Sequence, residues 1–174
     1  MASIIEDTVA EAMGKLGRVR AKFNGLQGIF SLLMEEHKQL ATLLARAEMS
    51  TDPEKRAELW AKIRPELLAH ERAEAQTLYD VGSLPELVQL AELSSAHELQ
   101  EEELHALVQN LDSAAFASAQ WEACLKQVHE AVQRHARREE EEWFAVVQEA
   151  IGELRAKELE HQYTQVKQAL IATL

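Results

Sequence analysis

Apolar residues recur every three or four positions along most of this chain, which is the period of amphipathic α-helices. Four long stretches keep this period, at about residues 26–47, 53–81, 84–111 and 119–151. No alternating run of β-branched residues is long enough to predict a strand. We therefore expect an all-α fold. Because the connections between the four stretches are short, they favour an up-down-up-down four-helix bundle with its core at about residues 26–151.

Two further amphipathic segments flank this core, at about residues 4–23 and 153–174. Gly25 and Gly152 separate them from it, because glycine tolerates the left-handed backbone that commonly ends a helix. We expect one domain of residues 1–174, in which these two segments form additional N- and C-terminal helices.

A capping residue and two prolines mark the second helix of the core. Asp52 and Pro53 are typical of a helix start, since the aspartate can cap the helix and the proline suits its first turn. Pro65 lies in the middle of the same stretch and predicts a kink or a local break about one turn before His70.

Each core helix carries a histidine near its middle, inside the apolar stripe that we call the seam. A glutamate follows three of these histidines at a spacing of four residues, which places both side chains on one helix face. The seven polar seam residues are His37, His70, Glu74, His97, Glu101, His135 and Glu139. Since the midpoints of antiparallel helices lie at one level, we expect these side chains to share a single interior layer.

This layer predicts a metal site. Burying an unpaired carboxylate costs several kcal/mol, and no Lys or Arg occupies these seam positions to offset three of them. A pair of divalent or trivalent cations would supply the missing positive charge. Taken singly, a seam histidine is more often a hydrogen-bonded core residue than a ligand, so the alternative is a bundle without metal. Mixed histidine and carboxylate ligation is compatible with iron, manganese or zinc.

Charge and composition limit the classes of binding partner and the cellular compartment that we expect. The net charge of −12 argues against binding to nucleic acid and to anionic lipid. Cys124 is the single cysteine, which excludes an internal disulfide and fits a reducing compartment. The first residues are acidic, unlike a signal peptide, and no apolar run approaches the ~20 residues of a membrane helix. We expect a cytoplasmic protein.

The ordered histidines and glutamates resemble those of the hemerythrin family, in its HHE-domain branch, over roughly residues 26–152. This resemblance implies a four-helix bundle that holds a non-haem di-iron centre with an oxo or hydroxo bridge. It implies that His37 and His70 bind one iron and that His97 and His135 bind the other.

By the same resemblance, Glu74 and Glu139 would bridge the two irons. Oxygen-carrying members place their second bridging acid five residues after the last histidine, which here is Glu140, whereas the seam favours Glu139. Those members also have a histidine where this chain has Glu101. We expect that Glu101 is a seventh ligand on the His97 side, where it would make the site more anionic and favour the ferric state.

The resemblance implies that the centre binds dioxygen or a related small oxidant, for oxygen storage or for oxygen and redox sensing. Its pocket would be formed by apolar side chains, namely Leu33, Leu40, Leu67, Leu104 and Trp143. Two alternatives stay open: an enzyme that handles peroxide or nitric oxide or oxidises iron, and an iron-responsive interaction module. The sequence leaves open whether the protein is a monomer or a homodimer.

Overall fold

The computed structural model describes residues 25–79 and 91–174 and, within these, no strand. It confirms the all-α prediction. The helix expected at 4–23 and the expected start of the third core helix lie outside the described residues. The elements are α2 (Ile29–Met49), α3 (Pro53–Thr77), α4 (Ala91–Asp112), α5 (Ala119–Arg138), the π-helical turn η3 (Glu139–Trp143) and α6 (Phe144–Ile171).

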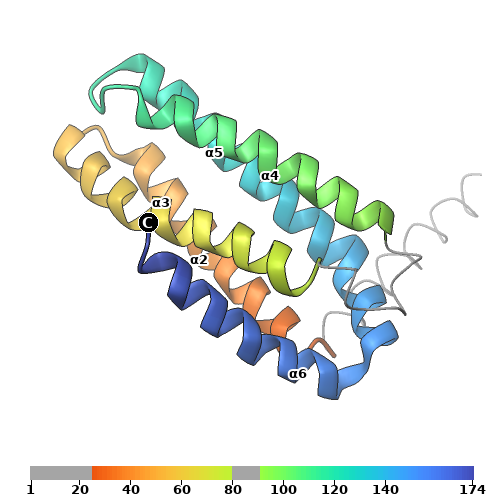
Figure 1. Cartoon of the computed structure of the whole chain (residues 1–174). Coiled ribbons are helices and arrows are strands. Elements are labelled where there is room, and N and C mark those ends of the chain that lie inside the picture. Colours follow the sequence, from red (N-terminus) through yellow and green to blue (C-terminus); the bar gives the residue numbers. More distant parts are fainter. Residues whose placement is uncertain (1–24, 80–90) are drawn as a thin grey trace, which may run out of the picture.

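Consecutive long helices run in opposite directions and form an elongated bundle (Figure 1). Within α6 the chain turns sharply at Gly152, whose φ of 77° is non-helical and suits a residue without a side chain. The rest of α6 then folds back and packs beside α2 and α3, on the side of the bundle away from α4 and α5 (Figure 1). None of the described helices combines the length and the apolar character needed to cross a membrane.

Helix α3 begins as expected but does not break at its internal proline. The Asp52 side chain accepts a hydrogen bond from the Glu54 amide and caps the helix. Helix α3 then continues through Pro65 as far as Thr77, so the expected local break is wrong. Proline removes one hydrogen bond to the carbonyl four residues earlier, and that residue, Ala61, is exposed to water. The solvated side of the helix therefore tolerates the missing bond.

Two apolar clusters fill the interior, one toward each end of the bundle. The first is centred on Leu44, Ile63, Val108 and Trp121, and the second on Phe30, Leu78, Phe144, Leu159 and Tyr163. The five residues expected to line a pocket, Leu33, Leu40, Leu67, Leu104 and Trp143, are all buried in one cluster or the other. Between the clusters lies the layer of polar seam residues, with apolar side chains above and below it.

The turn η3 changes which residues face the core. A continuous α-helix would continue the α5 seam through Val146 and Ala150, as the sequence suggests. The wider π-turn accommodates one extra residue, and the buried position moves to Val147, while Val146 is 43% exposed. The buried positions after Trp143 are therefore displaced by one residue from those of a continuous α-helix.

Candidate metal centre

Six of the seven polar seam residues come together at one level of the bundle. They come from α2, α3, α4, α5 and the first residue of η3, so each long helix of the core contributes at least one. Their exposed fractions lie between 0% and 4%. The six residues are His37, His70, Glu74, His97, His135 and Glu139.

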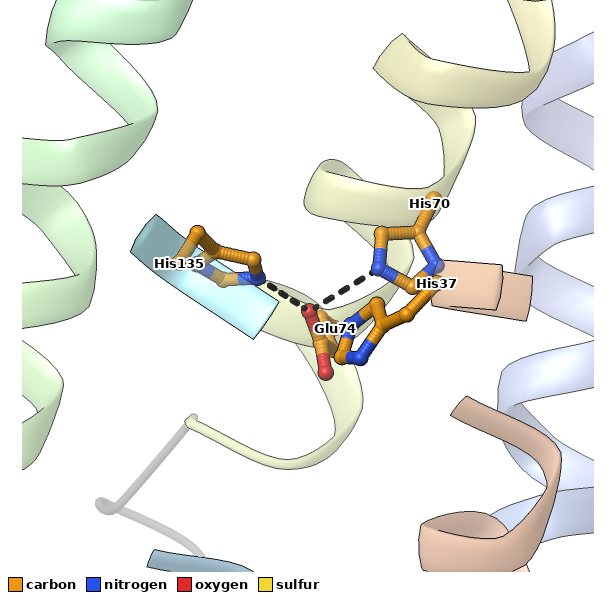
Figure 2. Close-up of side chains that lie close together, drawn as sticks. All are labelled: His37, His70, Glu74 and His135. Atoms are coloured by element: carbon orange, nitrogen blue, oxygen red, sulfur yellow. Dashed lines mark ion pairs between the residues drawn. The ribbon is translucent and has the colours of Figure 1, made fainter. Parts of the chain in front are cut away.

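The carboxylate of Glu74 lies at the centre of this group (Figure 2). Its Oε2 is 3.6 Å from His70 Nε2, which belongs to the same helix. The same oxygen is 3.7 Å from His97 Nε2 and 3.4 Å from His135 Nε2. One carboxylate thus faces imidazoles from both halves of the bundle, as a group shared by two cations would.

The structure separates the roles of Glu139 and Glu140. Glu139 is fully buried, with its Oε2 3.3 Å from His37 Nε2 and 3.2 Å from His135 Nε2. Glu140 lies on the outer side of His37, where its Oε1 is 2.9 Å from Nδ1 and its side chain is 25% exposed. Glu139 therefore points into the layer, and Glu140 contacts it only through the back of an imidazole.

The ligand-type atoms form two overlapping groups in which all atoms lie within 4.8 Å of one another. One group consists of His37, His70, Glu74 and His135, and the other of Glu74, His97, His135 and Glu139. Each contains imidazole nitrogen and carboxylate oxygen, which together suit iron, zinc and similar cations. Glu74 and His135 belong to both groups, so two cations could be held side by side.

The inner atoms of these residues have no hydrogen-bond partner in the described structure. They include Nε2 of all four histidines, both carboxylate oxygens of Glu74 and Oε2 of Glu139. Buried polar atoms are nearly always hydrogen-bonded, because leaving one unpaired costs about 1–3 kcal/mol. So many unpaired atoms facing a common point fit a cation as their partner.

The outer nitrogens of three of the four imidazoles, in contrast, are partnered. Nδ1 of His37 is 2.9 Å from Glu140, and Nδ1 of His70 is 2.9 Å from Glu36. Nδ1 of His135 is 3.3 Å from the side-chain oxygen of Gln100. Metal-binding histidines commonly donate their second N–H to such an acceptor, which fixes the tautomer and leaves the other nitrogen free for the metal. The residues present therefore fit a metal centre.

Without a cation, imidazoles and carboxylates perturb each other's pKa. Burial alone would lower the pKa of His37, but the adjacent carboxylates of Glu139 and Glu140 outweigh it and raise this pKa to about 9. Burial likewise opposes a charge on His135, yet the Glu139 carboxylate raises the pKa of His135 well above its usual value. Burial would raise the pKa of Glu139, but the neighbouring His135 holds it well below its usual range. Protons therefore occupy the places that a cation would take.

Glu71 is a buried carboxylate of the layer that the seam did not reveal. It is 3% exposed, and neither of its carboxylate oxygens has a hydrogen bond. These oxygens lie 3.6 Å from His135 Nε2 and 4.0 Å from His97 Nε2. Glu101, expected as the seventh ligand, is half-buried and is not among the grouped atoms. A wider reading of the α3 face would have found Glu71, because it follows the buried Leu68 by three residues.

Aromatic rings cover the layer on the side of the second apolar cluster. Tyr79 donates a hydrogen bond to Glu139 Oε1 at 2.5 Å, and its ring stacks on His97 with centroids 4.2 Å apart. Phe144 stacks on His37 with centroids 6.0 Å apart. The two aromatic residues occupy equivalent positions nine residues after His70 and His135, so the stacking follows the internal repeat of the sequence.

The sequence profile of the hemerythrin HHE cation binding domain matches residues 28–147. This chain belongs to the hemerythrin HHE family. The match contains all six clustered residues and ends before the C-terminal part of α6. As a hemerythrin-like protein, the chain is a cation-binding helical bundle.

A curated relative of this hemerythrin-like chain is a DNA nickase from Nostoc sp., 24% identical over 169 residues. The alignment covers 95% of this chain but 46% of the nickase, so the chain spans about half the length of the relative that it matches. No solved structure matches the chain.

Proposed function

We propose that this hemerythrin-like chain holds two iron ions and binds dioxygen or a related small oxidant at them. The observation that carries the proposal is the set of unpaired buried atoms that converge on two overlapping points. His37 and His70 would hold one iron, and His97 and His135 the other. Glu74 and Glu139 would contact both. Iron supplies a redox-active cation that can exchange electrons with dioxygen, peroxide or nitric oxide.

We further propose Glu71 as a ligand on the His97 and His135 side. Its unpaired, buried carboxylate supports this role better than the half-buried position of Glu101 does. The role of Glu101 as a ligand stays a prediction.

The surrounding residues orient the ligands and exclude water. Glu36 and Glu140 hold the Nδ1 sides of His70 and His37, so that Nε2 of each faces the centre. The Tyr79 hydroxyl holds one oxygen of Glu139 and leaves the other free. The apolar clusters above and below keep bulk water away, which strengthens every charge interaction within the layer.

A small cavity supports a ligand of few atoms. It measures about 30 Å³ and lies between α4 and α5, lined by Gln100, Arg134, His135 and the buried Glu71, among others. This space has room for a molecule of only a few atoms, so it suits a diatomic ligand. On its outer side Arg134 and Glu103 form an exposed ion pair at 2.8 Å, which could open to admit the ligand.

The first test is the metal content of protein purified without chelator or affinity metal. We expect about two irons per chain, as two overlapping ligand groups require. The reduced, oxygen-free protein should gain a visible absorption band when air is admitted and lose it again when oxygen is removed. A chain that contains no metal and takes up no ferrous iron would contradict the proposal.

A second function, turnover of peroxide or nitric oxide, is favoured by the three buried carboxylates Glu71, Glu74 and Glu139. A ligand set rich in carboxylate stabilises the ferric state and makes reversible oxygen binding harder. Sustained peroxide consumption by the iron-loaded protein would indicate an enzyme, whereas a single stoichiometric oxidation would indicate a carrier or sensor. We do not extend DNA nicking to this chain, because its net charge of −12 disfavours binding to DNA.

A further inference from the structure

The C-terminal part of α6, after Gly152, contacts the metal centre although it lies outside the region that matches the family. Tyr163 on this segment is fully buried, and its hydroxyl lies 2.9 Å from Nδ1 of His70. The same hydroxyl donates to Glu36 Oε2 at 2.5 Å. Four residues further along the helix, Lys167 places its Nζ 2.8 Å from that oxygen. Three donors from two helices thus meet at one carboxylate oxygen.

This arrangement determines the tautomer and the orientation in which the His70 imidazole faces a cation. For Nε2 to bind a metal, the imidazole must be neutral and must carry its proton on Nδ1. Glu36 Oε2 lies 2.9 Å from Nδ1 and can accept that proton, and the Tyr163 hydroxyl and Lys167 Nζ hold the same oxygen in place.

The segment is also fitted closely against the rest of the bundle. Gly28, just before α2, has a φ of 59°, and a Cβ added there would lie 2.4 Å from the backbone of Ala156. Only glycine allows the two segments to approach so closely. Leu159 is 1% exposed in the second apolar cluster, and Lys167 forms a further ion pair of 3.0 Å with Glu66 on α3.

We infer that the C-terminal part of α6 is a component of the metal centre, in which Tyr163 and Lys167 position Glu36 and, through it, His70. Docking of this segment and binding of a cation at His70 therefore strengthen each other. By thermodynamic reciprocity, the factor by which docking raises metal affinity equals the factor by which metal favours docking. A segment of about 19 residues is marginally helical alone, so its order depends on these contacts. The inference rests on the proposed metal centre.

The test measures anaerobic ferrous iron affinity of the full chain against a competing chelator. Tyr163→Phe removes only the hydroxyl, and Lys167→Met removes only the charge. We expect each to weaken iron binding about tenfold, the lower end of the effect of groups that support a metal ligand. The control variant on the same segment is Lys157→Met, which removes an exposed positive charge and should bind iron as the wild type does.

A second readout follows the segment itself by amide hydrogen exchange. In the wild type, ferrous iron should slow exchange across residues 153–171, and this slowing should be smaller in Tyr163→Phe. If Tyr163→Phe and Lys167→Met bind iron as tightly as the wild type, the inference is overturned while the metal centre stands. An equal loss of affinity in Lys157→Met would also overturn it, because the loss of any positive charge on the segment would then explain the effect. A wild type that takes up no iron would overturn the proposed function as well.

Discussion

Two buried polar regions of this molecule differ in how their charged groups are compensated. Near the loops at one end, Arg56 is 4% exposed and stacks over Trp121 at 5.1 Å. Three of its nitrogens donate hydrogen bonds: Nε to the Ser50 carbonyl at 2.7 Å, Nη1 to the Phe116 carbonyl at 2.9 Å and Nη2 to Glu122 at 2.6 Å. The region around Arg56 satisfies its charge with groups of the chain itself.

In the central layer, by contrast, many buried polar atoms have no hydrogen-bond partner in the described structure. The outer nitrogens of three of the four imidazoles are partnered, but the inner nitrogens and oxygens face each other without hydrogen bonds. Burial alone therefore does not identify a binding site, since Arg56 is as buried as the ligand residues. What distinguishes the layer is the direction of its unpaired atoms, which all point to one place.

Replacing the shared carboxylate should have the largest effect. We expect Glu74→Ala to lose bound iron, because this side chain faces three of the four imidazoles. Stabilisation by ligand, about 4 kcal/mol at a thousandfold excess over Kd, should disappear with it. Thermal unfolding with and without ferrous iron measures this loss, and exposed Glu102→Ala should keep the iron-dependent rise. Unchanged iron content in Glu74→Ala would contradict the assignment of the centre.

Replacing Arg56 should affect stability and leave the metal in place. Arg56→Met removes three hydrogen bonds and leaves the half-buried Ser50 and Phe116 carbonyls without this partner, so we expect a loss of about 2–4 kcal/mol in the free energy of unfolding. The neighbouring exposed Lys55→Met should change it by less than about 0.5 kcal/mol. Urea unfolding and metal analysis of both variants check this. If Arg56→Met also lost iron, the two regions would be energetically coupled.

The two regions should also differ in their response to pH once metal is removed. The raised pKa of His37, about 9, means that its stabilising contribution is complete below about pH 6.5 and is lost as pH rises through 9. The lowered pKa of Glu139 contributes above about pH 4.5 and is lost as pH falls. The metal-free protein should therefore be most stable between about pH 4.5 and 6.5. Its free energy of unfolding there should exceed that at pH 9 by on the order of 2 kcal/mol.

Metal should change how the stability of the central layer depends on pH. Metal binding displaces protons from the ligands, so metal affinity should rise with pH while metal-free stability falls. Unfolding curves at several pH values, with and without iron, measure both trends. A metal-free protein that grows more stable between pH 6.5 and 9 would contradict the assigned pairing of His37.

The smallest effect should separate two acidic residues. We expect Glu71→Gln to weaken iron binding about tenfold, because a buried unpaired carboxylate is lost. Glu101→Gln should have less effect, since this side chain is half-buried and lies outside the clustered atoms. Both replacements keep shape and remove one charge, so each is the control for the other. The reverse order would restore Glu101 as the seventh ligand.

Much of the layer could be predicted because helix period and chain midpoints are properties of the sequence. Spacing of four residues placed Glu74 under His70 and Glu139 under His135, and both pairs are buried together. Glu71 was missed because a narrow seam omits the flanking positions of a helix that is covered on two sides. The buried run of Leu67, Leu68, Ala69 and His70 in the structure shows how wide that face is.

Other features depended on contacts between distant segments. The role of Tyr163 required knowing that the chain reverses at Gly152 and returns beside Glu36. Leu154, an apolar residue just after this reversal, is 81% exposed, and the buried face of the returning segment begins at Ala156. The expected break at Pro65 does not occur. The free-energy cost of a proline inside a helix depends on whether water reaches the freed carbonyl, which the local sequence does not reveal.

The π-turn η3 also shifts the helical register between α5 and α6. Residues before it present their seam to the metal layer, and one extra residue rotates everything after it by about 100°. This rotation places Phe144 against His37 and aims the chain so that its last segment can return to Glu36. Glu139 and Glu140 in this turn contact the layer, whereas the exposed Glu141 and Glu142 serve mainly to set its length. Removing Glu141 would turn the downstream helix away from the centre although every proposed ligand would still be present.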